Sequence, residues 1–249
     1  MVNFFLSIFF PVIGILSCAR HSTVTSLELS HQYLANVTAD SVTNLLLRPY
    51  KLKHDSEMTE VIVYSEEALL KGQPEGNLGN FVSDCLLERA ASEFREKNIT
   101  IDAVLLNNGG LRVSLPKGEI TKGKLFELMP FDNEMMIVEI SGKKFYEMLC
   151  FIAAKGGMPV AGFRMEINTK KKPVNVTVNG NVLDTNATYH VVSSDYLING
   201  GDNITFFSDG KKYATSLFIR DILISYCRKL TASGKTLDVK TDGRISFSK

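Results

Sequence analysis

One stretch of about twenty residues constrains the fold of this chain more than any other. Between residues 77 and 97, apolar side chains recur at spacings of three and four, which is the period of a helix with one buried face. The stripe consists of Leu78, Phe81, Val82, Cys85, Leu86 and Ala90. Asn77 precedes it and suits an N-cap, because its side-chain oxygen can accept a hydrogen bond from a free backbone N–H. This is the clearest helix that the sequence predicts.

Strand-like patterns lie on both sides of this helix. Short apolar runs that are typical of strands occupy residues 61–64, 101–106, 135–140 and 244–247. From 160 to 193 the apolar period is two, and Asn179-Gly180 is a hairpin signal within it. Further helix-like patterns cover residues 39–58, 141–157 and 213–230, and Pro49 predicts a kink or break in the first of them. Helices and strands that alternate in this non-uniform order predict an α/β (α+β mixed-sheet) domain, with helices flanking a mixed sheet.

Composition bounds the function classes. The 249 residues are 45% hydrophobic and 22% charged, which is enough apolar content for a normal core. The formal net charge is only +1, so the chain lacks the basic surplus of a nucleic-acid-binding protein, and no nucleic acid is expected as a partner.

The N-terminus predicts export. Residues 2–18 are almost free of polar groups but are too short to span a bilayer comfortably, although no Lys or Arg precedes them. The run ends Ile15-Leu16-Ser17-Cys18, which resembles a bacterial lipobox. We expect a lipoprotein-type signal peptide at 1–17, lipidation of Cys18 and a polar tether at 18–37. The product would be an exported cell-envelope protein held to a membrane by lipid. A signal peptide that merely contains a cysteine and a buried N-terminal strand are the alternatives.

The other three cysteines do not indicate a metal site. Cys85, Cys150 and Cys227 are far apart in the sequence and form no C-x-x-C pair, so a zinc site is not expected. Each falls in a helix-like apolar pattern, which favours buried free thiols.

Three segments gather polar, glycine and aromatic residues at the ends of predicted strands. They are Asn107-Asn108-Gly109-Gly110-Leu111-Arg112, Met129-Pro130-Phe131-Asp132-Asn133 and 194–203, which contains Tyr196, Gly200, Gly201 and Asp202. Each segment taken alone is explained by an ordinary turn. Taken together they suggest a nucleotide site, because two aromatic rings can clamp a base and an arginine can bind phosphate, while a carboxylate suits a ribose diol.

The same segments carry a resemblance to a known family. "NNGGLR", "MPFDN" and "DYLINGGDN", in this order, together with the helix opening "GNLGNFVSDCL", resemble the C-terminal substrate-binding domain of the 5′-nucleotidase family. That family includes ecto-5′-nucleotidase, bacterial UDP-sugar hydrolase and 2′,3′-cyclic-nucleotide phosphodiesterase. The resemblance covers about residues 38–249 and implies one domain of that type, in which 38–60 would be a linker-type helix.

The resemblance also implies a role for each site residue. Asn107 and Arg112 would contact the phosphate–ribose side of the ligand, and Asn133 would touch the edge of the base. Phe131 and Tyr196 would stack on the base, although the family more often has Phe at the second place. Asp202 would hold the ribose hydroxyls. The backbone around the ligand would be shaped by Gly109, Gly110, Gly200 and Gly201.

Two departures from the family pattern matter. The family has one or two arginines just before the helix opening, whereas this chain has Lys71-Gly72-Gln73-Pro74 there, so a cationic contact is missing or comes from Lys71. In the family, a separate N-terminal metallophosphoesterase domain binds two metals through Asp-x-His, Gly-Asp and Asn-His-Asp/Glu motifs. None of the four histidines lies in such a motif; they are His21, His31, His54 and His190. No catalytic residue, metal ligand or cofactor is therefore predicted in this chain, and divalent metals are expected only on a partner chain.

These expectations define a leading hypothesis and two alternatives. The leading hypothesis is the nucleotide-recognising half of a 5′-nucleotidase or nucleotide-sugar hydrolase, acting with a separate metallophosphoesterase chain. The first alternative is a non-catalytic surface lipoprotein that binds nucleosides or nucleotides. The second is a surface scaffold that no longer binds a ligand. Whether the chain takes part in catalysis at all stays open at this level.

Overall fold

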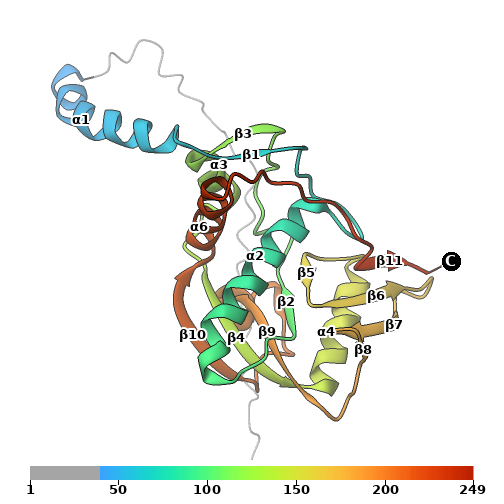
Figure 1. Ribbon diagram of the computed structural model, residues 1–249. Coiled ribbons are helices and arrows are strands. Elements are labelled where there is room, and N and C mark those ends of the chain that lie inside the picture. Colours follow the sequence, from blue (N-terminus) through green and yellow to red (C-terminus); the bar gives the residue numbers. More distant parts are fainter. Residues whose placement is uncertain (1–39, 249) are drawn as a thin grey trace, which may run out of the picture. The chain divides into compact units, whose positions relative to one another are not determined.

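The computed structural model describes residues 40–248 (Figure 1). The predicted signal peptide, Cys18 and the predicted tether at 18–37 all lie outside these residues. The chain divides into two units after Leu45, and the second unit, Leu46–Lys249, holds all of the sheets. Among the described residues, no helix is both long enough and apolar enough to cross a membrane.

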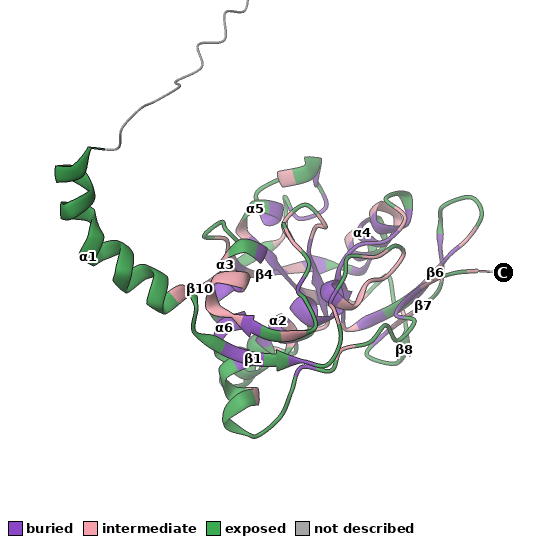
Figure 2. Ribbon diagram, turned by 90° about the horizontal axis from the view of Figure 1, so that it is seen from above, coloured by how far each residue is buried: buried purple, intermediate pink, exposed green. Residues whose placement is uncertain are grey.

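The first helix, α1, spans Ser41–Met58 and contains no buried residue (Figure 2). The prediction of a helix here is confirmed, but Pro49 does not break it. The expected apolar stripe stays exposed: Leu46 is 68% exposed and Leu52 is 60% exposed. Its role as a linker stays a prediction.

A five-stranded mixed sheet forms the centre of the second unit, in the order β10-β4-β9-β2-β5. The bounds of these strands are β2 Ala103–Leu105, β4 Glu134–Ser141, β5 Val160–Ala161, β9 Thr188–Ser194 and β10 Lys211–Phe218. β4 is antiparallel to both β10 and β9, whereas β2 runs parallel to β9 and antiparallel to β5. The predicted mixed-sheet fold class is therefore confirmed.

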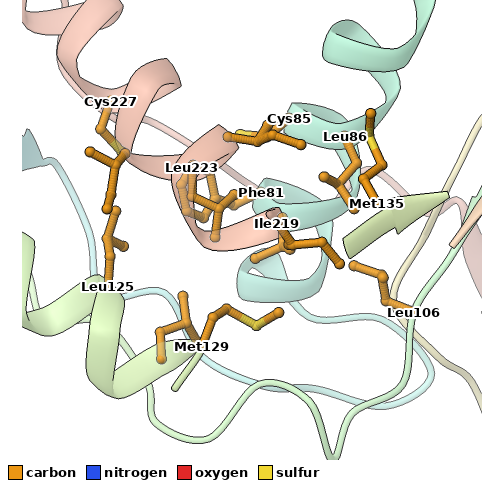
Figure 3. Close-up of a cluster of buried hydrophobic side chains, with 14 of the residues drawn as sticks. Phe81, Cys85, Leu86, Leu106, Leu125, Met129, Met135, Ile219, Leu223 and Cys227 are labelled. Atoms are coloured by element: carbon orange, nitrogen blue, oxygen red, sulfur yellow. The ribbon is translucent and has the colours of Figure 1, made fainter. Parts of the chain in front are cut away.

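Successive side chains on a strand point to opposite faces of the sheet, and both faces are buried at β2, β4, β5 and β9, whereas the edge strand β10 has no buried residue. Val104 and Val192 join one hydrophobic cluster, and their neighbours Leu105 and Val191 join the other. The first cluster is completed by helices α2 (Asn77–Phe94), α3 (Lys122–Leu128) and α6 (Ile219–Ala232). Figure 3 shows side chains from all three helices in this cluster, with Met135 of β4 beside Leu86 of α2. The second cluster is completed by α4 (Gly142–Ala154) and by strands of a second sheet.

Two smaller sheets flank the central one (Figure 1). The four-stranded sheet has the order β11-β6-β7-β8, with bounds β6 Phe163–Ile167, β7 Pro173–Val178, β8 Asn181–Val182 and β11 Ile245–Phe247. The two-stranded sheet pairs β1 (Val61–Ser65) with β3 (Gly118–Thr121) in antiparallel orientation. Three short helical turns complete the second unit: η1 Arg95–Lys97, α5 Asp195–Ile198 and η2 Gly201–Asn203.

Three local predictions were wrong. Asn77 is the first residue of α2 rather than its N-cap, because its side chain instead bridges the backbone of Ala68 and Leu70. The predicted helix at 213–230 begins only at Ile219, because residues 211–218 form β10 and pair with β4. Cys150 is partly exposed, whereas Cys85 and Cys227 are buried free thiols as expected.

Candidate functional site

The strand directions bring the three predicted segments to one edge of the central sheet. β2 and β9 are parallel, so the residues that follow them, Asn107 and Tyr196, emerge at the same edge. β4 is antiparallel to β9, so its start lies beside the end of β9, where Met135 pairs with Ser194. The backbone N–H of Glu134 also donates to Asp195 Oδ1 at 3.2 Å. Phe131 and Asn133, which precede β4, therefore reach the same edge.

A cavity of about 430 Å³ opens there. It is lined by Asn107, Gly109, Gly110, Arg112, Phe131, Asn133, Tyr196 and Asp202. These are eight of the ten site residues predicted from the sequence. The other two, Gly200 and Gly201, lie in the turn between Tyr196 and Asp202. Lys71, the possible replacement for the missing arginines, is not among the lining residues. The structure thus brings the predicted residues together, while their individual roles stay predictions.

Asp202 is at the centre of a polar network in this cavity. Asn107 Nδ2 donates to one of its carboxylate oxygens at 2.9 Å, and the Tyr196 hydroxyl donates to the other at 2.9 Å. The backbone N–H of Asp202 donates to the Tyr196 hydroxyl oxygen at 3.2 Å. The network joins residues 95 positions apart in the sequence, and it fixes the direction of the carboxylate.

Close approaches require glycine at two positions beside this network. A Cβ on Gly201 would lie 2.5 Å from the Tyr196 ring, and a Cβ on Gly110 would lie 2.8 Å from Asn107 Oδ1. Both distances are shorter than van der Waals contact, so any larger residue would displace Tyr196 or Asn107. The glycines therefore allow the Tyr196 ring and the Asn107 amide to reach Asp202.

The two predicted aromatic residues both offer accessible ring surface. Phe131 is 56% exposed and Tyr196 is 48% exposed, although large apolar side chains are usually buried. The Arg112 guanidinium lies 5.9 Å from the centre of the Phe131 ring, and Nη1 donates to the Gly109 carbonyl at 3.3 Å. Arg112 and Asp202 are the charged residues among those that line the cavity, one of each sign.

Sequence reasoning missed Arg220, which supports the cavity from α6. Its guanidinium is buried and contacts the segment that carries Phe131 and Asn133, through the Met129 carbonyl and the Asp132 carboxylate. These partners lie 91 and 88 positions away in the sequence, so no local pattern could have indicated them. Within residues 40–248, no three His, Cys, Asp or Glu side chains are grouped so that they could hold a metal ion.

Comparison with known proteins agrees with the geometry. The family model "5'-nucleotidase, C-terminal domain" matches residues 61–209, which is more than half of the chain and includes all three segments. The "Trifunctional nucleotide phosphoesterase protein YfkN" of Bacillus subtilis is 29% identical over 220 residues, which are 80% of this chain and 14% of that protein. The "Cell wall protein Lmo0130" of Listeria monocytogenes is 26% identical over 186 residues, which are 68% of this chain and 23% of that protein.

A solved structure extends the agreement to the fold. The 5′-nucleotidase precursor of Thermus thermophilus superposes with a TM-score of 0.70 at 27% identity, over 84% of this chain and 43% of that one. The chain thus spans less than half the length of each of these relatives. On the family match, the shared fold and the converging segments, the chain belongs to the 5′-nucleotidase family and has the fold of its C-terminal domain.

Proposed function

We propose that the cavity binds the base and ribose of a nucleotide or nucleotide sugar. On this proposal the chain is the nucleotide-recognising half of a 5′-nucleotidase-type hydrolase. The observation that carries the proposal is the convergence of three loops, distant in sequence, on one cavity lined by two exposed aromatic rings, an arginine and an oriented carboxylate. A volume of about 430 Å³ falls within the range of small-ligand pockets in proteins.

The lining residues divide naturally among the parts of a nucleotide. The exposed rings of Phe131 and Tyr196 offer stacking surfaces, each worth about 1–3 kcal/mol per stacked base. Asp202 accepts one side-chain hydrogen bond on each oxygen, and a carboxylate has about four acceptor positions, so two remain for the hydroxyls of a ribose. Arg112 uses one N–H on Gly109 and keeps further donors for phosphate.

We assign the hydrolytic step to a separate metallophosphoesterase chain. Phosphoester hydrolysis at a useful rate needs a large lowering of the barrier, which a two-metal site supplies by activating water and neutralising charge. The cavity contributes a single carboxylate and no histidine, which suits recognition of the substrate rather than activation of water. Divalent metals would belong to that partner chain.

We also propose that the protein is exported and held at the cell envelope by lipid on Cys18. The apolar run at 2–18, with its Ile15-Leu16-Ser17-Cys18 ending, supports this assignment. A relative that is named a cell wall protein agrees with export.

Calorimetry with the full-length protein and AMP tests the binding proposal. We expect AMP to bind, and Phe131→Ala to weaken binding by roughly tenfold, because one stacking surface is lost. Phe247→Ala is the matched control, because Phe247 is 59% exposed, close to the 56% of Phe131, and does not line the cavity. Absence of AMP, adenosine and UDP-glucose binding to the wild type would refute the proposal and leave the scaffold alternative.

The same titrations separate the hydrolase half from a non-catalytic nucleoside binder. One observation favours the second candidate: the lining residues carry one positive and one negative charge, and Lys71 is not among them. If the nucleoside binder is correct, adenosine will bind as tightly as AMP. A second assay mixes the protein with a metallophosphoesterase chain that has the metal motifs. The hydrolase proposal requires faster hydrolysis of AMP or a UDP-sugar than that chain achieves alone.

A further inference from the structure

Arg220 lies where a buried arginine is unfavourable. It is the second residue of α6, near the positive end of the helix dipole, and it is only 9% exposed. Removing a cation from water is costly in free energy unless hydrogen bonds and opposite charge offset the loss. Its Nε–H is buried and finds no acceptor among the described residues, which adds to the cost. An apolar side chain of similar length would avoid both costs, so the contacts of Arg220 need an explanation beyond stability.

Those contacts fall on a single segment. The guanidinium lies 4.2 Å from the centre of the Phe126 ring. Nη1 donates to the Met129 carbonyl at 3.0 Å, where α3 has just ended, and Nη2 donates to the Asp132 carboxylate. Carbonyls at the C-terminal end of a helix have no partner within the helix, so Met129 offers a free acceptor. Arg220 therefore fixes the path of the chain as it leaves α3.

This path leads directly to the cavity. Phe131 lies between Met129 and Asp132, the two residues that accept hydrogen bonds from Arg220, and Asn133 follows Asp132 directly. The Asn133 carbonyl also accepts a hydrogen bond from the N–H of Ile219, the neighbour of Arg220, at 2.9 Å. The side chain of Phe131 is 56% exposed, so packing of its own ring contributes little to its position. The position of that ring depends on the backbone anchors on either side of it.

We propose that Arg220 is a positioning residue for ligand binding: it holds residues 129–133 so that Phe131 and Asn133 line the cavity. This inference rests on the proposed function, because a positioning role requires that the cavity binds a ligand. Arg220 itself is not among the residues that line the cavity, so it acts through the segment and does not touch the ligand.

Two variants and one control test the inference. Arg220→Met removes the hydrogen bonds while filling similar space. Asp132→Ala removes one partner from a side chain that is 69% exposed, so this variant should fold normally. Arg228→Met is the control, because Arg228 lies on the same helix and its guanidinium is paired with Glu60 instead.

The first measurement needs no ligand. The N–H of Met129 donates to the Leu125 carbonyl and the N–H of Ile219 donates to the Asn133 carbonyl, so these two amides report on the held segment. Their hydrogen exchange in the full-length protein should be faster in Arg220→Met and in Asp132→Ala than in the wild type, and unchanged in Arg228→Met. Unchanged exchange in both test variants would overturn the inference, whatever the protein binds.

The second measurement is AMP affinity. We expect Arg220→Met to weaken binding by roughly tenfold, the loss expected for one stacked ring. In the Phe131→Ala background the same substitution should have a smaller effect than in the wild type, because Asn133 is then the remaining lining residue through which Arg220 acts. Faster exchange with unchanged AMP affinity would overturn the positioning role. Failure of the wild type to bind AMP would count against the proposed function alone, and the exchange result would still decide whether Arg220 holds the segment.

Discussion

Two buried arginines serve two different regions of this molecule. Arg244 and Arg220 are each 9% exposed, and each bonds to carboxylate and carbonyl oxygens. Arg244 makes a bidentate pair with Asp84 at 2.7 and 3.0 Å, and also donates to Asp242 and to the Val160 carbonyl. Its partners come from α2, β5 and the C-terminal tail, and none of them lines the candidate cavity. Among the described residues, the hydrogen-bond partners of Arg220, Met129 and Asp132, both lie on the loop that follows α3.

The two arginines differ in how completely they are hydrogen-bonded, and this difference assigns fold stability to Arg244 and support of the cavity to Arg220. Every nitrogen of the Arg244 guanidinium has an acceptor, whereas Nε of Arg220 has none within the described part of the chain. Although burial lowers the pKa of Arg244, its bonds to Asp84 and Asp242 outweigh burial and raise that pKa further above its ordinary value. Loss of Arg244 should therefore destabilise the whole second unit, and loss of Arg220 should act mainly on the cavity.

The largest effect is expected at Arg244. Arg244→Met removes a buried guanidinium and the hydrogen bonds that it donates to Asp84, Asp242 and the Val160 carbonyl. The two carboxylates that remain are 49% and 42% exposed, so water can solvate them, and we expect a loss of about 1.5–3 kcal/mol in the free energy of unfolding, the value of a hydrogen bond to a charged group. Urea denaturation of the full-length protein measures this loss. Arg164→Met is the control, because Arg164 also contacts Asp242, at 3.4 Å, but its side chain is 55% exposed, so it should change stability little. If Arg244→Met is as stable as the wild type, Arg244 does not stabilise the fold and the contrast between Arg244 and Arg220 is wrong.

A smaller effect, confined to the cavity, is expected at Tyr196. Tyr196→Phe keeps the ring and removes the hydroxyl that donates to Asp202, a hydrogen bond worth about 0.5–1.5 kcal/mol. AMP affinity should fall a few-fold, and the preference for AMP over 2′-deoxy-AMP should shrink, because Asp202 is less well oriented toward the ribose. Tyr64→Phe is the control at a similarly exposed tyrosine outside the cavity. An unchanged preference for AMP would show that the hydroxyl does not orient Asp202.

The smallest effect concerns acid pH. Burial raises the pKa of Asp242, but hydrogen bonds from Arg244 and the charges of Arg244 and Arg164 outweigh burial and lower that pKa below its ordinary 3.8. Asp242 therefore stabilises the fold above pH 3.8, and this contribution is lost as the pH falls through the folded-state pKa. Thermal unfolding from pH 6 to pH 3 should show a shallower decline in Asp242→Asn than in the wild type. Equal slopes would mean that the pair with Arg244 does not control acid stability.

Elements whose sequence pattern is local were predicted correctly, whereas elements that are decided by contacts with distant parts of the sequence were not. The helix α2 at Asn77–Phe94 and the strand β6 at Phe163–Ile167 were predictable because their periods are local and their apolar faces are regular. The boundary at Ile219 was not, because the alternation of Tyr213, Thr215 and Leu217 leads directly into the helical spacing of α6. Pairing with β4, more than seventy positions earlier, decides that residues 211–218 are a strand.

In the candidate site, too, features with a local sequence signal were predictable and features that depend on distant contacts were not. Its residues could be named because each loop has its own signature of glycine, amide and aromatic residues, and the structure brings the three loops together. The contacts of Arg220 with the loop that carries Phe131 could not be predicted. Arg220 lies in an ordinary helical pattern, and its hydrogen-bond partners lie about ninety positions away.

The parallel pairing of β2 with β9 has a consequence for folding. The bond from Asn107 to Asp202 can form only after two strands more than eighty positions apart have come together with β4 beside them. Contacts of such long range form late and depend on the rest of the sheet. A partly folded chain would therefore have no binding site, and nucleotide in excess of its dissociation constant would draw the population toward the fully assembled sheet by mass action.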